Sequence, residues 1–416
     1  MSEKILLRHR DIQGLNLLKV YVENGGFETW KKTVKSGKPE DLVNLVKASG
    51  LRGRGGAGFP TGVKWSFLPN DIWPHYVVAN ADESEPGTFK DRELLEFNPY
   101  QFLEGLMLTA FTVQANDAYI YFRGEFAQIA RKFEERISEL TAKGYLGDAL
   151  FGTQYSLRVH THLGAGAYVC GEETALLESI EGKLGQPRLR PPFPAVAGLF
   201  DKPTVINNVE TLANIPFIFA KGADAFRKNG TDKSPGTKIF SLSGRVKKPG
   251  NYELPLGTTF RELIFKHGEG ILNDAKIKAI MPAGASSTLI AATEQILDTP
   301  MDYEATTALG APLGSASVIV LDETVSVSRL VNSTTHFFKH ESCGKCTPCR
   351  EGTYWMSHIS DRIEAGKAKK EDIDLLKSVA AQMQNKCLCA LGEFSTMTVI
   401  SGLNNFRADF EARLES

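Results

Sequence analysis

The chain has 416 residues, of which 42% are hydrophobic and 23% charged, enough for two or three domains of about 150 residues each. Its 48 Lys and Arg residues against 49 Asp and Glu residues leave a formal net charge of −1, which argues against a general nucleic-acid-binding protein. The longest apolar runs, such as residues 318–321, are only a few residues long, whereas a membrane-spanning helix needs about 20. The first residues show neither a secretory nor a transit signal, so we expect a cytoplasmic protein.

Helix-like and strand-like patterns alternate through about the first 225 residues. Apolar periodicity predicts helices over residues 39–49, 98–113, 125–142 and 172–180. Short apolar runs predict buried strands over residues 75–79, 118–122 and 156–161. Such alternation is typical of a layered α/β domain.

The pattern changes after a polar segment, residues 228–238, which contains two glycines and a proline and is the best candidate for a linker. Beyond it we expect a small α+β unit with strands at 239–243, 252–256, 277–281 and 317–321 and a short helix at 260–267. From about residue 335 the pattern is helical and charged. The predicted domains are therefore residues 1–235, 236–332 and 333–416.

Five of the six cysteines lie from residue 343 onward, a crowding that favours metal binding over a disulfide scaffold. Cys343, Cys346 and Cys349 have C-x2-C-x2-C spacing, and either Cys387 or Cys389 could be a distant fourth ligand. Three clustered thiols and a remote one are typical of a [4Fe–4S] cluster. Zinc is the main alternative, although its sites usually contain two Cys-x-x-Cys pairs, often with His.

A glycine-rich stretch at residues 50–60, GLRGRGGAGFP, can form a loop whose backbone N–H groups bind an anion. The loop follows a predicted helix, whereas the common dinucleotide fingerprint follows a strand. Phosphate binding is therefore one interpretation and a purely structural turn is the other.

Three further motifs are rich in polar side chains. NADESEPGTFKDR, at residues 80–92, follows a predicted strand and is either a ligand site or a solvated acidic loop. In GAGAYVCGEETAL, at residues 164–176, Glu172 and Glu173 begin a predicted helix. The helix dipole favours carboxylates at this end, which accounts for the presence of one of the two. The amides of Asn207 and Asn208, in INNVETL, either cap a helix or hold a phosphate or ribityl chain.

Taken together, six motifs resemble those of the NADH-binding flavoprotein subunit of respiratory complex I, the NuoF family. They are the three polar motifs above, the glycine-rich loop, TGVKWSF, and ESCGKCTPCREG. The resemblance runs from about residue 24 to the C-terminal helices. It implies a Rossmann-like domain that binds FMN and NADH, a small ubiquitin-like domain of the SLBB type, and a four-helix bundle that carries one [4Fe–4S] cluster.

The resemblance also implies roles for individual residues, with no side chain acting as a general acid or base. FMN would be held by Gly53, Arg54, Gly55, Gly56, Gly58, Lys64, Asn80, Asp82, Glu83, Tyr168, Gly171, Asn207, Asn208 and Thr211. NADH would be bound by Phe59, Phe67 and Phe193 around the adenine and by Glu85, Glu172, Glu173 and Arg190. The cluster would be held by Cys343, Cys346, Cys349 and Cys389, because the family's fourth cysteine precedes Ala-Leu-Gly, which leaves Cys387 as an extra thiol.

The function implied is that of the electron-entry subunit of an NADH:quinone oxidoreductase, peripheral to the inner membrane through its complex. Its partners would be a thioredoxin-like [2Fe–2S] subunit of the NuoE type and a large iron–sulfur subunit of the NuoG type. A 2′-phosphate near Glu173 would be repelled, which predicts a preference for NADH over NADPH. The alternatives are the diaphorase subunit of an NAD-linked hydrogenase or formate dehydrogenase, and a metal-binding electron relay or scaffold without flavin.

Overall fold

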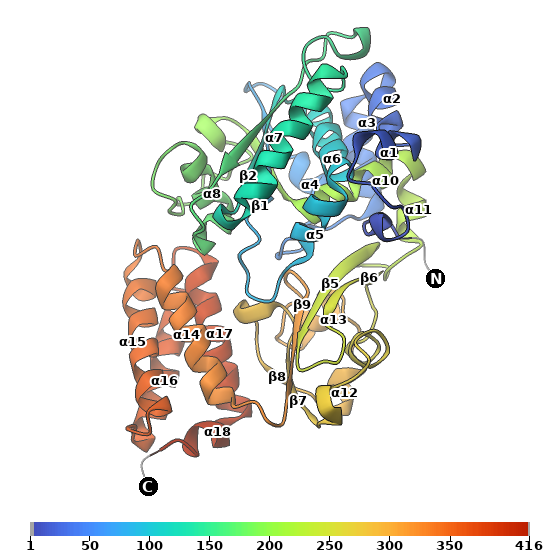
Figure 1. Ribbon diagram of the computed structural model, residues 1–416. Helices are drawn as coiled ribbons and strands as arrows, with labels where there is room; N and C mark the ends of the chain where they lie inside the picture. The colour runs from blue at the N-terminus through green and yellow to red at the C-terminus, as the bar shows by residue number, and fades with distance from the viewer. Residues whose placement is uncertain (1–3, 415–416) are drawn as a thin grey trace. The chain divides into compact units, whose positions relative to one another are not determined.

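The computed structural model describes residues 4–414 and divides them into two compact units (Figure 1). The first unit comprises the residues up to Ser84, Phe89–Ile239 and Glu253–Gly257. The second comprises Glu85–Thr88, Phe240–Tyr252 and the residues from Thr258 onward. Among the described residues no helix is long and apolar enough to cross a membrane.

The first unit is built around a four-stranded parallel sheet in the order β3-β2-β1-β4. Its strands are β1 (Tyr76–Ala81), β2 (Asp117–Phe122), β3 (Arg158–Leu163) and β4 (Thr204–Asn208). From β1 the chain moves outward to β2 and β3, and β4 then lies on the other side of β1. The reversal creates a switch point between β1 and β4, and open parallel sheets bind ligands beyond the strand ends at such a point.

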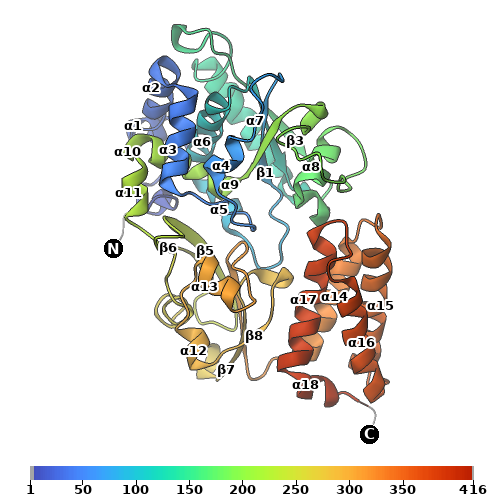
Figure 2. The same cartoon turned by 180° about the vertical axis from the view of Figure 1, so that it is seen from behind.

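Eleven α-helices are described in the first unit, and α6 packs against β1 and β2 while α9 packs against β1 and β4. The helices are α1 (Leu18–Glu23), α2 (Glu28–Ser36), α3 (Pro39–Ser49), α4 (Thr61–Trp65), α5 (Lys90–Phe97), α6 (Pro99–Thr112), α7 (Ala127–Ala142), α8 (Glu173–Ile180), α9 (Val209–Ala213), α10 (Ile215–Lys221) and α11 (Ala223–Arg227). Short 3₁₀ turns are η1 (Arg8–Arg10), η2 (Gly124–Phe126), η3 (Leu150–Gly152), η4 (Tyr168–Gly171) and η5 (Leu199–Asp201). Figure 2 shows α2, α3, α10 and α11 side by side.

Helix α3 illustrates how the sequence sets these boundaries. Pro39 begins the helix, where its missing N–H costs nothing, and Glu40 and Asp41 lie in the first turn, where the helix dipole favours acidic groups. Gly50 ends the helix with a left-handed φ of 68°, which glycine adopts without strain. The glycine-rich loop therefore starts at a helix end, as predicted.

The N-terminal segment of the first unit is attached through one carboxylate. The two oxygens of Glu253 accept hydrogen bonds from the backbone N–H groups of Ile5 and Leu7, each at 2.8 Å. Burial raises the pKa of Glu253. Residues 253–257 thus complete a unit whose other residues precede residue 240.

The second sheet has five strands in the order β6-β5-β9-β7-β8. They are β5 (Thr237–Gly244), β6 (Gly250–Pro255), β7 (Ile277–Met281), β8 (Ile290–Ala291) and β9 (Ser317–Asp322). β9 is parallel to β5 and antiparallel to β7, which makes the sheet mixed. The associated short helices are η6 (Glu262–His267, a π-helix), η7 (Leu272–Asp274), η8 (Gly284–Ser286), α12 (Glu294–Leu297) and α13 (Tyr303–Ala308).

The C-terminal part of the second unit is a four-helix bundle followed by a short helix. The helices are α14 (Val327–Glu341), α15 (Thr347–Glu364), α16 (Lys370–Met383), α17 (Ala390–Asn405) and α18 (Arg407–Glu411). Each helix of the bundle packs against the next, and α14 also packs against α17, which closes the bundle (Figure 1). The interior contains apolar side chains such as Val331, Met356 and Val399. It also contains buried hydroxyl groups, and those of Thr335 and Ser360 hydrogen-bond to each other at 2.9 Å.

The structure confirms the α/β domain, the small α+β part and the helical C-terminal part. Several individual elements differ from the sequence-based expectation, and two of the differences bear on the site. β4 is not predicted, because its last two residues are asparagines and its apolar run, Val205 and Ile206, is only two residues long. The predicted linker at residues 228–238 is not free chain throughout, since Thr237 and Lys238 lie in β5 and are buried.

Candidate functional site

Amide side chains meet at the switch point of the parallel sheet. In the register of β1 and β4, Asn80 pairs with Asn208, so both lie at the carboxyl ends of their strands. The side-chain amide of Asn80 donates to the carbonyl of Gly171 at 2.9 Å. The indole of Trp65 donates to Oδ1 of Asn207 at 2.9 Å. Several predicted flavin-site motifs thus converge at this sheet edge.

The glycine-rich loop lies against the start of α9. The backbone N–H of Arg54 donates to Oγ1 of Thr211 at 2.8 Å, and a Cβ added at Gly55 would lie 2.8 Å from Cβ of Asn208. The close approach therefore requires glycine at residue 55. The Arg54 side chain is fully buried and donates to the carbonyl of Pro235, so we expect its backbone rather than its guanidinium to face a ligand.

The remaining loop glycines close the loop and keep part of its backbone open. The N–H of Gly53 donates to the carbonyl of Phe59 at 2.8 Å, which closes the loop on itself. Gly58 has a φ of 63°, and a Cβ at Gly56 would meet no atom within 4 Å, so its backbone is open. An open backbone with N–H groups is what an anion-binding loop requires.

The acidic motif divides between the two units. Asp82 lies in the first unit, where its Oδ2 accepts from the hydroxyl of Ser84 at 2.9 Å and would lie 3.1 Å from a Cβ at Gly171. Glu83 accepts from the backbone N–H groups of Asp91 and Arg92 at 2.6 and 2.9 Å. Its pKa is raised to about 8, chiefly by burial. Glu85 belongs to the second unit, where its carboxylate accepts from the N–H of Ser286 at 2.8 Å.

The two adjacent glutamates at the start of α8 have different surroundings. Glu172 caps the helix, because its carboxylate accepts from the N–H groups of Thr174 and Ala175, each at 2.9 Å. Glu173 forms ion pairs with Lys64 at 2.9 Å and Arg190 at 3.1 Å, and Arg190 also lies 3.6 Å from a carboxylate oxygen of Glu172. Although burial acts in the opposite direction, these cations lower the pKa of Glu173. Capping thus accounts for Glu172, whereas Glu173 carries a charge at the predicted site.

Aromatic side chains of the predicted site are exposed. Phe59 and Phe67 are 47% and 54% exposed, and their ring centroids lie 6.0 Å apart. Phe193 is 56% exposed in the loop between α8 and β4, and Tyr168 opens η4 just before the two glutamates. Exposure of large apolar rings to water is unfavourable in the free protein, and such rings are suited to stacking on a planar heterocycle.

The predicted cluster cysteines gather at the ends of bundle helices. Cys346 and Cys389 directly precede α15 and α17, and Cys349 lies in the first turn of α15. Burial raises the pKa of the Cys349 thiol to about 11, with contributions from Cys346, Cys389 and Cys343. Within residues 4–414 no three His, Cys, Asp or Glu side chains are grouped tightly enough to hold a single metal ion. The four donors are all sulfur, the ligand type that holds iron–sulfur clusters, so the residues fit such a cluster.

Cys387 lies in the same region as the four predicted ligands. Its thiol donates to the carbonyl of Met383 at 3.4 Å. A Cβ added at Gly392 would lie 2.4 Å from its sulfur and 3.2 Å from Cβ of Cys349, so this glycine allows the two segments to meet. Burial, together with the neighbouring Cys349, raises the pKa of Cys387 to about 12.

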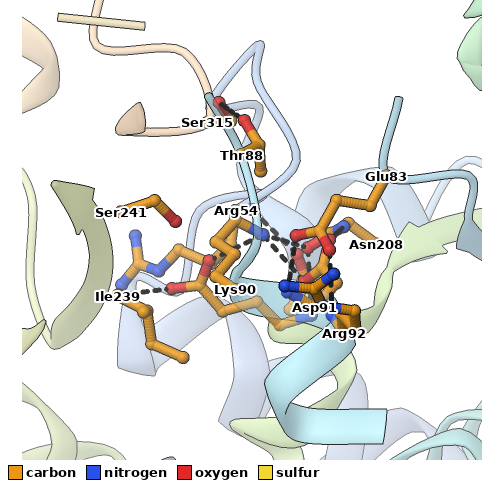
Figure 3. A network of polar contacts seen from close by, with 12 residues as sticks. Arg54, Glu83, Thr88, Lys90, Asp91, Arg92, Asn208, Ile239, Ser241 and Ser315 are labelled. Carbon is orange, nitrogen blue, oxygen red and sulfur yellow. Dashed lines mark hydrogen bonds and ion pairs between the residues drawn. The ribbon is translucent and has the colours of Figure 1, made fainter. Parts of the chain in front are cut away.

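The site residues predicted from the sequence do not include four charged residues that lie near the amides. Lys90, Asp91, Glu210 and Lys238 are buried and joined by ion pairs, and Figure 3 labels Lys90 and Asp91 among them. Periodicity could not reveal them, since charged residues in short helices and a polar stretch usually face solvent. The sequence contains one indication that Lys90 and Asp91 are buried, since they stand between the apolar residues Phe89 and Leu94 at the start of a helix.

Three family models match the chain. Residues 46–217 match the Nuo51 FMN-binding domain, residues 239–280 the SLBB domain, and residues 329–413 the iron–sulfur binding region of NADH-ubiquinone oxidoreductase F. They cover the parallel-sheet region, the start of the mixed sheet and the helical bundle. These matches favour a [4Fe–4S] cluster over zinc and a flavoprotein over a scaffold without flavin.

Curated relatives match over nearly the whole chain. The F 2 subunit of the NADH-quinone oxidoreductase of Rhizobium meliloti (strain 1021) is 49% identical over 416 residues, which cover all of this chain and 98% of the relative. The F subunit of the NADH-quinone oxidoreductase of Streptomyces coelicolor is 48% identical over 398 residues, 95% of this chain and 88% of the relative.

The structure is similar to that of a chain from an air-oxidised NAD⁺-reducing [NiFe]-hydrogenase. The TM-score is 0.85 at 34% sequence identity, over all of this chain and 67% of the other. The chain therefore belongs to the family of NADH-quinone oxidoreductase F subunits, with the FMN-binding and [4Fe–4S]-binding regions of that family.

Proposed function

We propose that this chain is the electron-entry subunit of an NADH:quinone oxidoreductase, with the roles of individual residues given below. Bound FMN would supply the conversion between a two-electron hydride donor and one-electron transfer, and a [4Fe–4S] cluster would supply the one-electron acceptor. The chain's own residues supply binding, orientation and charge. The observation that supports this best is the convergence of Asn80, Asn208 and the glycine-rich loop at the sheet's switch point.

The proposed flavin ligands are the backbone of the loop from Gly53 to Gly58, together with Lys64 and the polar side chains at the strand ends. The proposed NADH ligands are Phe59, Phe67 and Phe193 for the adenine and Glu85, Glu172, Glu173 and Arg190 for the rest of the dinucleotide. The proposed cluster ligands are Cys343, Cys346, Cys349 and Cys389. We assign residues 1–235 to the FMN and NADH domain, 236–332 to the SLBB-type domain and 333–416 to the bundle.

The partners proposed for this chain are a thioredoxin-like [2Fe–2S] subunit of the NuoE type and a large iron–sulfur subunit of the NuoG type. Through them the chain would be cytoplasmic and peripheral to the inner membrane. The curated relatives support this, because each is named as one subunit of a larger oxidoreductase.

An anaerobic absorbance spectrum of the purified chain, recorded before and after addition of NADH, tests the proposal. We expect flavin bleaching by NADH, with about four irons and one FMN per chain measured on the same sample. Iron without flavin, or zinc without iron, would contradict it.

The diaphorase subunit of an NAD-linked hydrogenase is the second candidate, favoured by the structural similarity to the hydrogenase chain. Deletion of the gene distinguishes the two. Loss of NADH:quinone reductase activity from membranes supports the first function, and loss of hydrogen-dependent NAD⁺ reduction supports the second.

Replacing Glu173 with glutamine is expected to raise the ratio of kcat/KM for NADPH to that for NADH about tenfold. The substitution removes the carboxylate that would repel a 2′-phosphate, and with it the ion-pair partner of Lys64, while Arg190 keeps Glu172 at 3.6 Å. Steady-state kinetics with both nucleotides measure the ratio. An unchanged ratio would mean that Glu173 does not face the 2′ position.

Replacing Phe193 with alanine is expected to weaken NADH binding about 5- to 150-fold, the value of one aromatic–base stack. Phe97→Ala is the matched control, because Phe97 is also an exposed phenylalanine of the first unit but lies at the end of α5, outside the proposed site. The dissociation constant of NADH with the oxidant withheld gives the readout. Equal affinities in the two variants would exclude Phe193 from the adenine site.

A further inference from the structure

The side chain of Asn208 is held by three groups around the switch point. Its Nδ2 donates to Oδ2 of Asp91 at 2.6 Å, and its Oδ1 accepts from the backbone N–H of Glu210 at 3.0 Å. Nζ of Lys90 lies 3.4 Å from the same Oδ1 and donates to Oδ1 of Asp91 at 2.8 Å. Figure 3 shows Lys90, Asp91 and Asn208 together in this arrangement.

These contacts fix which way the amide points. The two sides of an amide differ, since the nitrogen donates and the oxygen accepts. A flipped Asn208 would place its oxygen against the Asp91 carboxylate and its NH₂ against the Lys90 ammonium and the N–H of Glu210. All three contacts would become repulsive, so the surroundings permit one orientation. In that orientation one Nδ2 hydrogen is used by Asp91, and the second remains for a ligand.

The groups that hold Asn208 are themselves fixed by buried charges. Glu210 is fully buried, and its Oε2 lies 3.0 Å from Nζ of Lys90 and 3.1 Å from Nζ of Lys238. Lys238 also donates to the carbonyl of Arg54 at 2.9 Å. The same chain of contacts therefore reaches the glycine-rich loop. It connects the loop, Lys90 and Asp91 of the acidic motif, and the β4–α9 junction, which all lie in the first unit.

We propose that Asp91 and Lys90 are positioning residues of the FMN site, which hold Asn208 so that its second Nδ2 hydrogen is presented to an oxygen of the cofactor. This rests on the assignment of Asn208 to the FMN site made above. Neither residue needs to touch the cofactor. Their effect is to make residue 208 a hydrogen-bond donor toward the ligand, which suits a phosphate or another acceptor oxygen.

The test compares FMN affinity in the full-length chain and its variants. Holoprotein is diluted, and the fluorescence of released FMN at equilibrium gives the dissociation constant, while iron per chain and thermal unfolding are measured on the same samples. We expect Asp91→Asn to raise the dissociation constant about tenfold or more, because a charge-assisted hydrogen bond that orients Asn208 is lost. Asp117→Asn is the matched control, since Asp117 begins β2 on the side of β1 away from β4 and pairs with His160.

A second variant separates positioning from folding. The double variant Asp91→Asn/Asn208→Asp restores an amide–carboxylate hydrogen bond, now donated by residue 91, and keeps a carboxylate beside Lys90. We expect it to unfold at nearly the wild-type temperature and still to bind FMN about tenfold or more weakly, since residue 208 then offers only acceptor oxygens. FMN affinity restored to the wild-type value would overturn the proposal and leave the bond a purely structural role.

Two further outcomes are decisive. Equal FMN affinity in Asp91→Asn and Asp117→Asn would also overturn the proposal. If Asp91→Asn alone fails to fold, the double variant provides the comparison. The iron and FMN contents of the wild-type chain are measured before any variant is compared. A wild-type chain with iron but no FMN would contradict the proposed function itself.

Discussion

Replacement of Cys389 by alanine is expected to abolish the [4Fe–4S] cluster, whereas replacement of Cys387 by alanine is expected to preserve it. Four thiolates hold such a cluster, and Cys389 directly precedes α17, where the helix dipole favours a thiolate. The Cys387 thiol instead donates to the carbonyl of Met383. Iron and acid-labile sulfide per chain, together with the electron paramagnetic resonance spectrum of the reduced protein, provide the measurement.

Cys387→Ala is itself the matched control, because the two cysteines are separated by a single residue and both lie near Cys349. The reverse result, with iron lost only from Cys387→Ala, would reassign the fourth ligand. Cys170→Ala supplies a second control, since Cys170 is a buried thiol of the first unit. Its iron content should equal that of the wild type.

Replacement of Glu210 by glutamine is expected to destabilise the chain by about 3–5 kcal/mol, the usual cost of removing one partner from a buried ion pair. Glu210 is the carboxylate shared by Lys90 and Lys238, and all three side chains are buried. Equilibrium denaturation followed by circular dichroism measures the change. Glu135→Gln, at an exposed position in the middle of α7, removes the same charge and should shift the transition by less than about 0.5 kcal/mol.

The same network predicts a pH dependence. Burial lowers the pKa of Lys238 to about 7, with Glu210 acting in the opposite direction and Lys90 and Arg54 in the same one. Asp91 and Glu210 raise the pKa of Lys90, although burial alone would lower it. Between about pH 7 and the ordinary lysine pKa near 10.4, the unfolded chain binds a proton at Lys238 that the folded chain does not, so this residue makes stability rise with pH.

Lys238→Met is expected to remove that rise, since methionine has a similar length and no proton to bind. Unfolding free energies measured from about pH 7 to pH 10 for wild type and variant test the prediction. Parallel curves would show that Lys238 does not titrate in this range.

Local spacing accounts for most of what the sequence predicted. The C-x2-C-x2-C run, the glycines around Arg54 and the apolar period of α6 each lie within a few residues, so no knowledge of the fold is needed to see them. Even the ends of α3 were readable, because Pro39 and Gly50 act on their own helix.

What the sequence did not predict depends on contacts between distant residues. β4 has a short apolar run, and it is a strand because it pairs with β1, which lies far away along the chain. Lys238 stands in a polar stretch that is typical of a linker, yet Glu210 compensates its charge in the interior. A buried charge cannot be distinguished from a solvated one until its partner is known.

The attachment of Ile5 and Leu7 to Glu253 has a consequence for the order in which the protein is made. Ile5 and Leu7 lack their hydrogen-bonding partner until residue 253 has been synthesised, and Lys238 reaches Glu210 only shortly before. The FMN-binding half therefore cannot finish folding while it is the only part translated. A fragment that ends at residue 217 would lack both contacts, so expression of this half alone should extend through residue 257.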